Sequence, residues 1–202
     1  MTQTGKTERR SGRSRPSWLA RQLVELRAAL HFKFWLTNQI CRLFPDFWSG
    51  VLRGRLYRRV GFHIGNGAFI MGNLDLVSGL PGFYEKLFIG PSTVIGTHVV
   101  MNLDAPVQIG RNVSLGPYVL IYTGTHQIGP GSNRRQPEVL ARPVLIEDGC
   151  WIGLGAMILP GVTVGRGSIV AAGAVVGQDV PPNSFVEGNP ARVVRQLPFG
   201  DR

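Results

Sequence analysis

The sequence is poor in the residues that carry metal and redox chemistry, and it contains no long apolar run. Only two cysteines and four histidines occur among 202 residues. Cys41 and Cys150 do not make a disulfide framework, and the histidines are not closely paired as zinc ligands are, so we expect no metal. No stretch of about 18 apolar residues occurs, which argues against a membrane-spanning helix. No signal-peptide pattern follows the first residues, and a cytoplasmic protein is expected.

Acidic residues are scarce in the N-terminal part of the chain. Residues 1–60 contain 13 Lys or Arg and 3 Asp or Glu, whereas residues 61–202 contain 9 of each. The whole net charge of +10 therefore belongs to the first 60 residues. Residues 1–16 are polar and basic, and glycine and proline interrupt them, so a disordered basic tail is expected. Residues 198–202 are expected to form a second, short tail.

A strict period of six residues runs from Ile146 to Pro181. The fourth position of the period is glycine in five of six blocks, where a tight corner needs a positive φ. A helix cannot use this period with so much glycine, whereas a hexapeptide repeat is the signature of a β-helix. An aliphatic residue opens every block and is expected to fill a central column: Ile146, Ile152, Ile158, Val164, Val170 and Val176. Cys150, at a fifth position, is expected to be a small core residue.

The repeat extends towards the N-terminus with irregularities. It starts near Ile64, and residues 72–88 look less regular. Ile95 and Ile109 are 14 residues apart, two more than two hexapeptides, so the surplus must bulge out near residues 102–104. Polar groups at an irregularity in a regular wall are often binding groups. The sequence thus predicts an all-β domain over residues 61–197.

A longer interruption follows in the middle of the domain. Residues 127–143 leave the repeat as a predicted loop, and His126 lies at its root. An excursion of this length inside a tight solenoid is usually functional. This loop is the first candidate for a functional site.

Residues 17–60 are predicted to be a basic, amphipathic helical segment. Ser17 suits an N-cap, and leucines at helical spacing follow it. Pro45-Asp46 is expected to end this helix and to cap a second one that carries Trp48. The helices either cover the open end of the β-helix or a neighbouring subunit, or they bind an anionic membrane surface as a peripheral anchor. No nucleic-acid partner is expected, because the basic run lacks a recognisable motif.

Several motifs together resemble those of a known family: Thr-Gly-Thr-His at 123–126, Cys-Trp-Ile-Gly at 150–153, Leu-Pro-Gly-Val-Thr-Val-Gly at 159–165, Ala-Ala-Gly-Ala-Val-Val at 171–176, Val-Pro-Pro-Asn-Ser at 180–184 and Gly-Asn-Pro-Ala-Arg-Val-Val at 188–194. With the repeats, they resemble the hexapeptide-repeat acyltransferases, in the branch of sugar O-acetyltransferases that includes galactoside, maltose and nodulation-type enzymes. The resemblance covers residues 60–197. It implies a left-handed parallel β-helix, a homotrimer, and active sites between neighbouring subunits.

Acetyl transfer from acetyl-CoA to a hydroxyl needs a base and a donor for the oxyanion. Imidazole, with an ordinary pKa near ~6.5, suits the base, and His126 matches the family's catalytic histidine. The resemblance implies the backbone N–H of Leu154 as the oxyanion donor. It also implies coenzyme contacts at Gly153 and Ala172, beside the pantetheine arm.

The remaining site residues also follow from the resemblance. Arg192 and Arg195 look like the contacts to the coenzyme phosphates, to which guanidinium groups are suited. Relatives often carry Lys or Arg where this chain has Gln178, so one phosphate contact is missing. The acceptor is expected to meet three residues: Asn102, Asp104 and Trp151.

The sequence therefore predicts a trimeric acetyl-CoA-dependent O-acetyltransferase of a saccharide, such as a precursor of a surface polysaccharide or glycolipid. Three alternatives remain. One is N-acylation of a nucleotide-linked amino sugar, and another is modification of an antibiotic. The third is a non-catalytic solenoid, which would leave His126 and its loop without a role.

Overall fold

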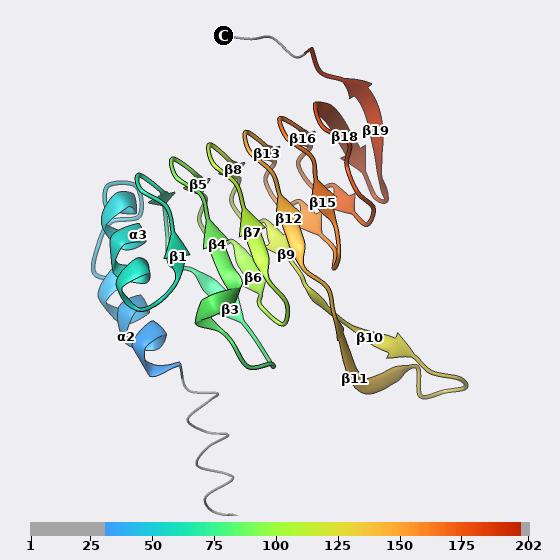
Figure 1. Ribbon diagram of the computed structural model, residues 1–202, viewed down its shortest axis with the longest axis horizontal. Helices are drawn as coiled ribbons and strands as arrows, with labels where there is room; N and C mark the ends of the chain where they lie inside the picture. Colours follow the sequence, from blue (N-terminus) through green and yellow to red (C-terminus); the bar gives the residue numbers. More distant parts are fainter. Residues whose placement is uncertain (1–30, 199–202) are drawn as a thin grey trace, which may run out of the picture. The chain divides into compact units, whose positions relative to one another are not determined.

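The computed structural model describes residues 31–198. The predicted tail over 1–16, residues 17–30 of the predicted helical segment and residues 199–202 lie outside the described residues. Three parallel β-sheets, which we call A, B and C, form the walls of a β-helix (Figure 1). The predicted β-helix of hexapeptide repeats is confirmed.

The chain visits the three sheets in turn, so that three short strands make one coil. Sheet A contains β1 (His63–Ile64), β4 (Leu87–Ile89), β7 (Val107–Ile109), β12 (Val144–Ile146) and β15 (Thr163–Val164). Sheet B contains β2 (Phe69–Ile70), β5 (Val94–Ile95), β8 (Ser114–Leu115), β13 (Trp151–Ile152), β16 (Ile169–Val170) and β18 (Ser184–Gly188), and the antiparallel strand β19 (Ala191–Gln196) ends it. Sheet C contains β3 (Asp75–Val77), β6 (Val100–Asn102), β9 (Leu120–Ile121), β14 (Met157–Ile158) and β17 (Val175–Val176).

The aliphatic residues that open each hexapeptide fill the axis of the solenoid, as predicted. Those from Ile146 to Val176 are all at most 1% exposed. The fourth residue of most blocks forms a corner with a positive φ, whereas Asp179 in the last block does not. It is glycine in the C-terminal coils but a larger residue in earlier ones, such as Asn112 (φ 53°) and Tyr118 (φ 60°). Cys150 is buried in this core, and desolvation raises the pKa of its thiol to about 11.

Residues 72–88 are less regular than the later coils, as expected, because residues 78–86 form bends, a turn and a 3-10 helix, although β3 keeps its place in sheet C. Strand β3 pairs in parallel with β6 and completes the first coil. A short 3-10 helix, η1 (Tyr84–Lys86), then leads into β4. The surplus between Ile95 and Ile109 lies where it was expected, in the turn after β6.

Two helices cover the first coil: α2 (Phe32–Cys41) and α3 (Gly50–Arg59). Helix α3 packs on β1 and β2. Gly50 and Gly54 allow this close approach, because a side chain there would meet the ring of Phe69 and the carbonyl oxygen of Ala68. A cap on the open end is the first of the two roles expected for this segment. Within residues 31–198, no helix is long and apolar enough to cross a membrane.

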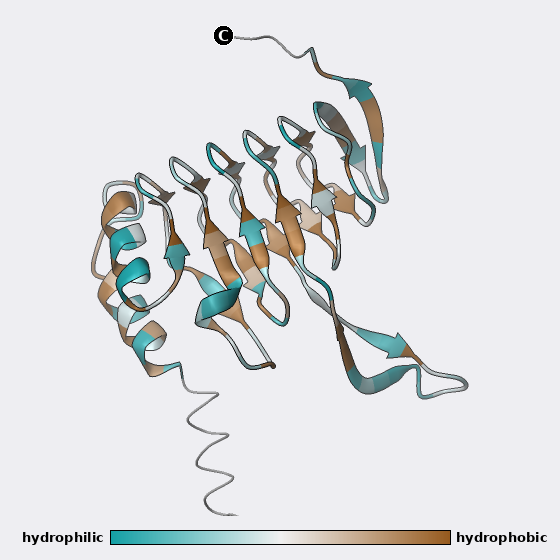
Figure 2. Ribbon diagram, in the orientation of Figure 1, coloured by the Kyte–Doolittle hydropathy of each residue, from teal (hydrophilic) through white to brown (hydrophobic). Residues whose placement is uncertain are grey.

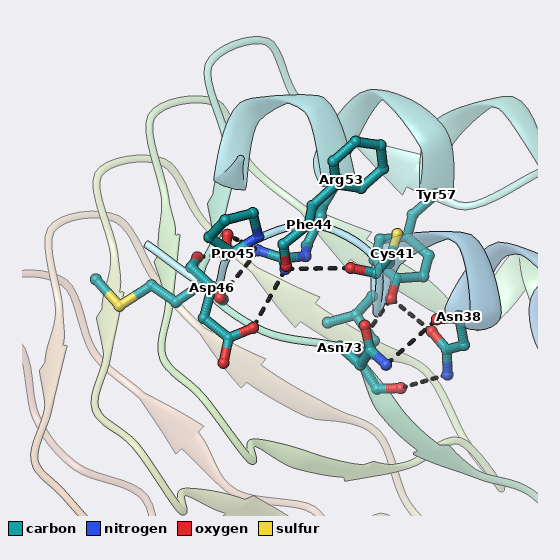
Figure 3. Close-up of polar contacts among 10 residues, drawn as sticks. Asn38, Cys41, Phe44, Pro45, Asp46, Arg53, Tyr57 and Asn73 are labelled. Carbon is teal, nitrogen blue, oxygen red and sulfur yellow. Dashed lines mark hydrogen bonds and ion pairs between the residues drawn. The ribbon is translucent and has the colours of Figure 1, made fainter. Parts of the chain in front are cut away.

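Helix α3 begins four residues later than the predicted cap at Pro45-Asp46. The intervening turn is fastened by Arg53, which is 0% exposed (Figure 3). Its guanidinium donates to the backbone oxygens of five residues: Cys41, Phe44, Pro45, Asp46 and Met71. It also lies 3.2 Å from the Asp46 carboxylate. The buried guanidinium therefore holds the turn between the two helices through the turn's backbone oxygens.

Candidate active site

The predicted loop is an antiparallel ribbon that leaves the solenoid between sheets C and A. It comprises β10 (Gly124–Ile128) and β11 (Arg135–Ala141), and it extends away from the coils (Figure 1). Gly124 pairs with Ala141, and His126 pairs with Val139. The Arg142 N–H donates to the Thr123 oxygen at 2.7 Å and closes the root. The segment expected as a loop over 127–143 leaves the repeat as predicted, but about half of it is strand, at 127–128 and 135–141.

The ribbon fixes the orientation of the His126 ring. Its Nδ1 lies 3.2 Å from the backbone oxygen of Glu138 on the opposite strand. A carbonyl oxygen only accepts, so the neutral ring must carry its proton on Nδ1. The lone pair is then on Nε2, which is the arrangement that a general base needs.

Asp104 lies beside the same face of the ribbon. A side chain on Gly124 would come within 2.5 Å of the Asp104 carboxylate. Residues 124 and 126 point to the same side of a strand, because side chains alternate. The Asp104 carboxylate and the His126 imidazole therefore belong to one face of β10, and the glycine makes room for the carboxylate.

A hydrogen-bond network holds Asp104 in place. The Asn102 amide donates to the Asp104 carboxylate at 2.9 Å, and the Gly79 N–H donates to it at 2.8 Å. The Asn102 side-chain oxygen accepts from the Thr123 N–H at 3.3 Å. Asn102 is buried, whereas Asp104 is partly exposed. Asn102, expected to contact an acceptor, here positions Asp104.

The predicted donor-side residues gather at a different corner, between sheets B and C. Leu154 lies in the turn after β13, and Ala172 lies in the corresponding turn of the next coil. The Gly173 N–H donates to the Leu154 oxygen at 2.9 Å, so the two turns stack. No acceptor within residues 31–198 pairs with the Leu154 N–H. Trp151 and Leu154 expose 56% and 55% of their surface.

Gly153 has a packing role that the sequence did not indicate. A side chain there would come within 2.6 Å of the Ala172 nitrogen, so the glycine allows neighbouring coils to stack. Gly155 instead has a φ of 66°, and a side chain there would meet open space.

Arg192 and Arg195 lie on β19, beyond the last coil. The Arg192 guanidinium donates to the Ala191 oxygen at 2.9 Å. The Arg195 guanidinium lies over the Phe185 ring, 5.3 Å from its centre. Both side chains are exposed.

The structure does not bring all predicted site residues together in one chain. His126 and Asp104 lie at the corner between sheets C and A, whereas Leu154 and Ala172 lie at the corner between B and C. The width of sheet C separates the two groups. Among residues 31–198, no three side chains of His, Cys, Asp or Glu converge as a metal site requires.

An apolar hollow of about 640 Å³ lies on the other side of the ribbon root. Leu120, Met157 and Leu159 line it from the solenoid, and Thr125 and Leu140 line it from the ribbon. Thr125 points away from the His126 face, because the two are adjacent on β10. The outward apolar residues of sheet C were the only sign of this hollow in the sequence.

Comparisons with known proteins agree with this fold. Residues 143–178 match the family described as bacterial transferase hexapeptide (six repeats). Nodulation protein L of Rhizobium meliloti is 53% identical over 105 residues, which are 49% of this chain and 57% of that protein. The match thus spans little more than half of this relative. Galactoside O-acetyltransferase of Lactococcus lactis is 32% identical over 72% of this chain and 68% of its own.

A solved structure extends the similarity to three dimensions. The hexapeptide-repeat acetyltransferase VCA0836 of Vibrio cholerae, in complex with acetyl coenzyme A, is 35% identical. Its TM-score is 0.71, over 85% of this chain and 88% of that one. The chain belongs to the hexapeptide-repeat acetyltransferase family, which confirms the resemblance of its motifs.

Proposed function

We propose that the protein is an acetyl-CoA-dependent O-acetyltransferase that acts on a hydroxyl of a saccharide. The observation that carries this proposal is the His126 ring, fixed through Nδ1 with Nε2 free, on one face with Asp104. The sugar acetyltransferase among the relatives supports the acceptor class. Asp104 accepts a hydrogen bond from a sugar hydroxyl, and Asn102 holds Asp104.

The reaction follows from these positions. Nε2 of His126 takes the proton of the acceptor hydroxyl as its oxygen bonds to the thioester carbon. The negative oxygen of the tetrahedral intermediate accepts from the Leu154 N–H. The intermediate then expels the coenzyme thiolate, which takes the proton back from the imidazolium. Gly153 and Ala172 contact the pantetheine arm, Trp151 lines the cleft, and Arg192 and Arg195 pair with the coenzyme phosphates.

The separation of the two corners supports a site shared between subunits, and we propose the homotrimer of left-handed β-helices that the resemblance implies. In one chain, His126 and Leu154 lie at opposite edges of sheet C. A complete site therefore needs His126 of one subunit and Leu154 of its neighbour. Cyclic symmetry would repeat this heterologous contact and close the ring.

The test measures thiol release from acetyl-CoA with a panel of galactosides, glucosides and amino sugars. We expect a hydroxyl acceptor to raise the rate, and His126→Ala to lower it by roughly 10²–10⁴-fold. His98→Ala is the matched control, because His98 stacks on Tyr118 at a corner of the solenoid. Stabilisation by acetyl-CoA should persist in His126→Ala. Turnover with amines alone would favour N-acylation, and full activity of His126→Ala would remove this residue from the mechanism.

A further inference from the structure

The outward sides of the two helices form an exposed apolar surface, which we call the helical face. Its members lie on α2, on α3 and on the turn between them: Phe32, Trp35, Leu36, Ile40, Leu43, Phe47, Trp48, Val51 and Leu52. All are exposed, and Trp48 is 90% exposed. Figure 2 shows apolar stretches on these helices, at the end of the solenoid.

The helices bury their opposite sides in the core. Cys41 of α2 and Tyr57 of α3 are 0% exposed, and Phe34 packs against Tyr57 and Phe62. The two helices also contact one another. Their core-facing sides thus explain how they cap the first coil, and the helical face is not needed for that role.

The charges around the helical face are almost all positive. Lys33, Arg42, Arg55 and Arg59 are exposed on the same two helices and the turn, whereas Arg58 donates to Asn66 and to the Gly65 oxygen of the first coil. Asp46 is the only acidic residue between 31 and 60, and its carboxylate contacts the buried Arg53. Exposed aromatic rings beside cationic side chains suit the boundary between anionic headgroups and acyl chains.

We propose that the helical face docks on an anionic membrane surface. Trp48, Phe47 and Leu43, on the turn, enter the headgroup boundary, and the arginines contact lipid phosphates. The exposed rings of Phe47 and Trp48 beside basic side chains favour the lipid boundary over an acid-rimmed protein surface. The docking does not depend on acetyl transfer.

The side of the ribbon on which His126 lies bears on the kind of acceptor, and this step rests on the proposed function. The His126 face of the ribbon is the Asp104 side, towards the N-terminal coils. The hollow on the opposite side is lined by Leu159, Pro160 and Gly177 of the C-terminal coils. The base therefore faces the end that carries the helical face, which suits a saccharide attached to a membrane lipid.

The experiment is co-sedimentation of the full chain with phosphatidylcholine vesicles, with and without about 30% phosphatidylglycerol. We expect binding only to the anionic vesicles and weaker binding in high salt. The variant Leu43→Ser/Phe47→Ser/Trp48→Ser should lower the partition constant by at least about ten-fold. Its matched control, Ile128→Ser/Val194→Ser, removes exposed apolar side chains elsewhere and should bind like the wild type.

Two double variants, each of which removes two positive charges, complete the test. Arg55→Gln/Arg59→Gln should weaken binding by about five-fold for each arginine, whereas Arg111→Gln/Arg135→Gln should not. If the triple-serine variant binds like the wild type, the proposal is wrong and the basic residues before residue 31 account for the binding. A change of its oligomeric mass would assign the helical face to a second copy instead. Thiol release from acetyl-CoA by the wild-type protein with a soluble acceptor tests the proposed function separately, because it needs no vesicles.

Discussion

Leu154 can be tested more sharply than most residues that act through a backbone N–H. It occupies the third position of its hexapeptide, where neighbouring blocks carry Pro91, Pro117 and Pro160. Pro117 lies in the turn stacked directly on the Leu154 turn, since its oxygen accepts from the Gly155 N–H at 2.9 Å. Proline thus fits this corner of the solenoid, and it removes the donor.

Leu154→Pro should fold normally and lose roughly 10²–10³-fold in turnover. Leu154→Ala keeps the N–H and should retain most of the activity. Thermal unfolding checks the fold, and thiol release from acetyl-CoA checks the rate. Equal rates for the proline and alanine variants would show that the oxyanion finds its donor elsewhere.

Because of Cys150, the free energy of unfolding of the domain should change with pH in the alkaline range. Its folded-state pKa is raised to about 11 by burial, from an ordinary value of 9.0. Between these two pKa values, the unfolded chain has lost the thiol proton and the folded chain keeps it. The free energy of unfolding should therefore fall as pH rises from about 9 to about 11, by about 1.4 kcal/mol per pH unit.

Cys150→Ala should flatten this part of the pH profile, measured by urea unfolding at several pH values. Alanine suits the site, because Ala156 and Ala174 occupy the same repeat position. A variant with an unchanged slope above pH 9 would assign the loss to another group. Tyr57, whose pKa burial also raises, is the next candidate.

At the scale of the elements, Arg53 decides whether the helical cap stays on the solenoid. It joins the start of α3 to the end of α2 and to Met71 of the first coil. Arg53→Ala would leave several buried carbonyl oxygens without a donor, and it should cost about 3–5 kcal/mol. Arg55→Ala, on the exposed side of the same helix, should change stability by less than about 0.5 kcal/mol. Chemical unfolding compares them, and similar midpoints would contradict this role.

The central column of the solenoid and the ribbon differ in how far the sequence predicts them. The central column follows from residue type and period alone, because a fixed spacing returns each aliphatic residue to the axis. The ribbon segment has no hexapeptide period, so the sequence predicts a loop there and gives no sign that its two strands pair. The role of Arg53 could not be predicted, because its residue type does not distinguish it from the other arginines of the helix. Its acceptors are backbone carbonyls of a turn, which residue types do not reveal.

At the scale of the whole molecule, the period also explains which parts of the site could be predicted. Leu154 and Ala172 are 18 residues apart, one full coil, so counting alone places them at the same corner. His126 lies at the start of an unrepeated segment, and no count gives its corner. The motifs identified the individual residues, but only the sheet order separates the acceptor side from the donor side.

This separation gives a prediction about mixed oligomers. His126→Ala and Leu154→Pro subunits should each be inactive alone. If a site uses His126 of one subunit and Leu154 of the next, random mixed trimers regain about a quarter of the wild-type sites. The two proteins are unfolded together, refolded as a mixture and assayed for thiol release. Activity no higher than that of the separate variants would place both groups in one subunit.

The helical cap also bears on how the protein avoids assembling into fibres. A parallel β-helix ends in strands whose backbone groups are unpaired, and such an edge is a template for the next chain. Here α3 covers β1 and β2 at one end, and the antiparallel strand β19 follows β18 in sheet B at the other. Detachment of the cap would leave the first coil open to end-to-end growth. Arg53, which holds the two helices on the first coil, therefore also opposes end-to-end assembly into filaments.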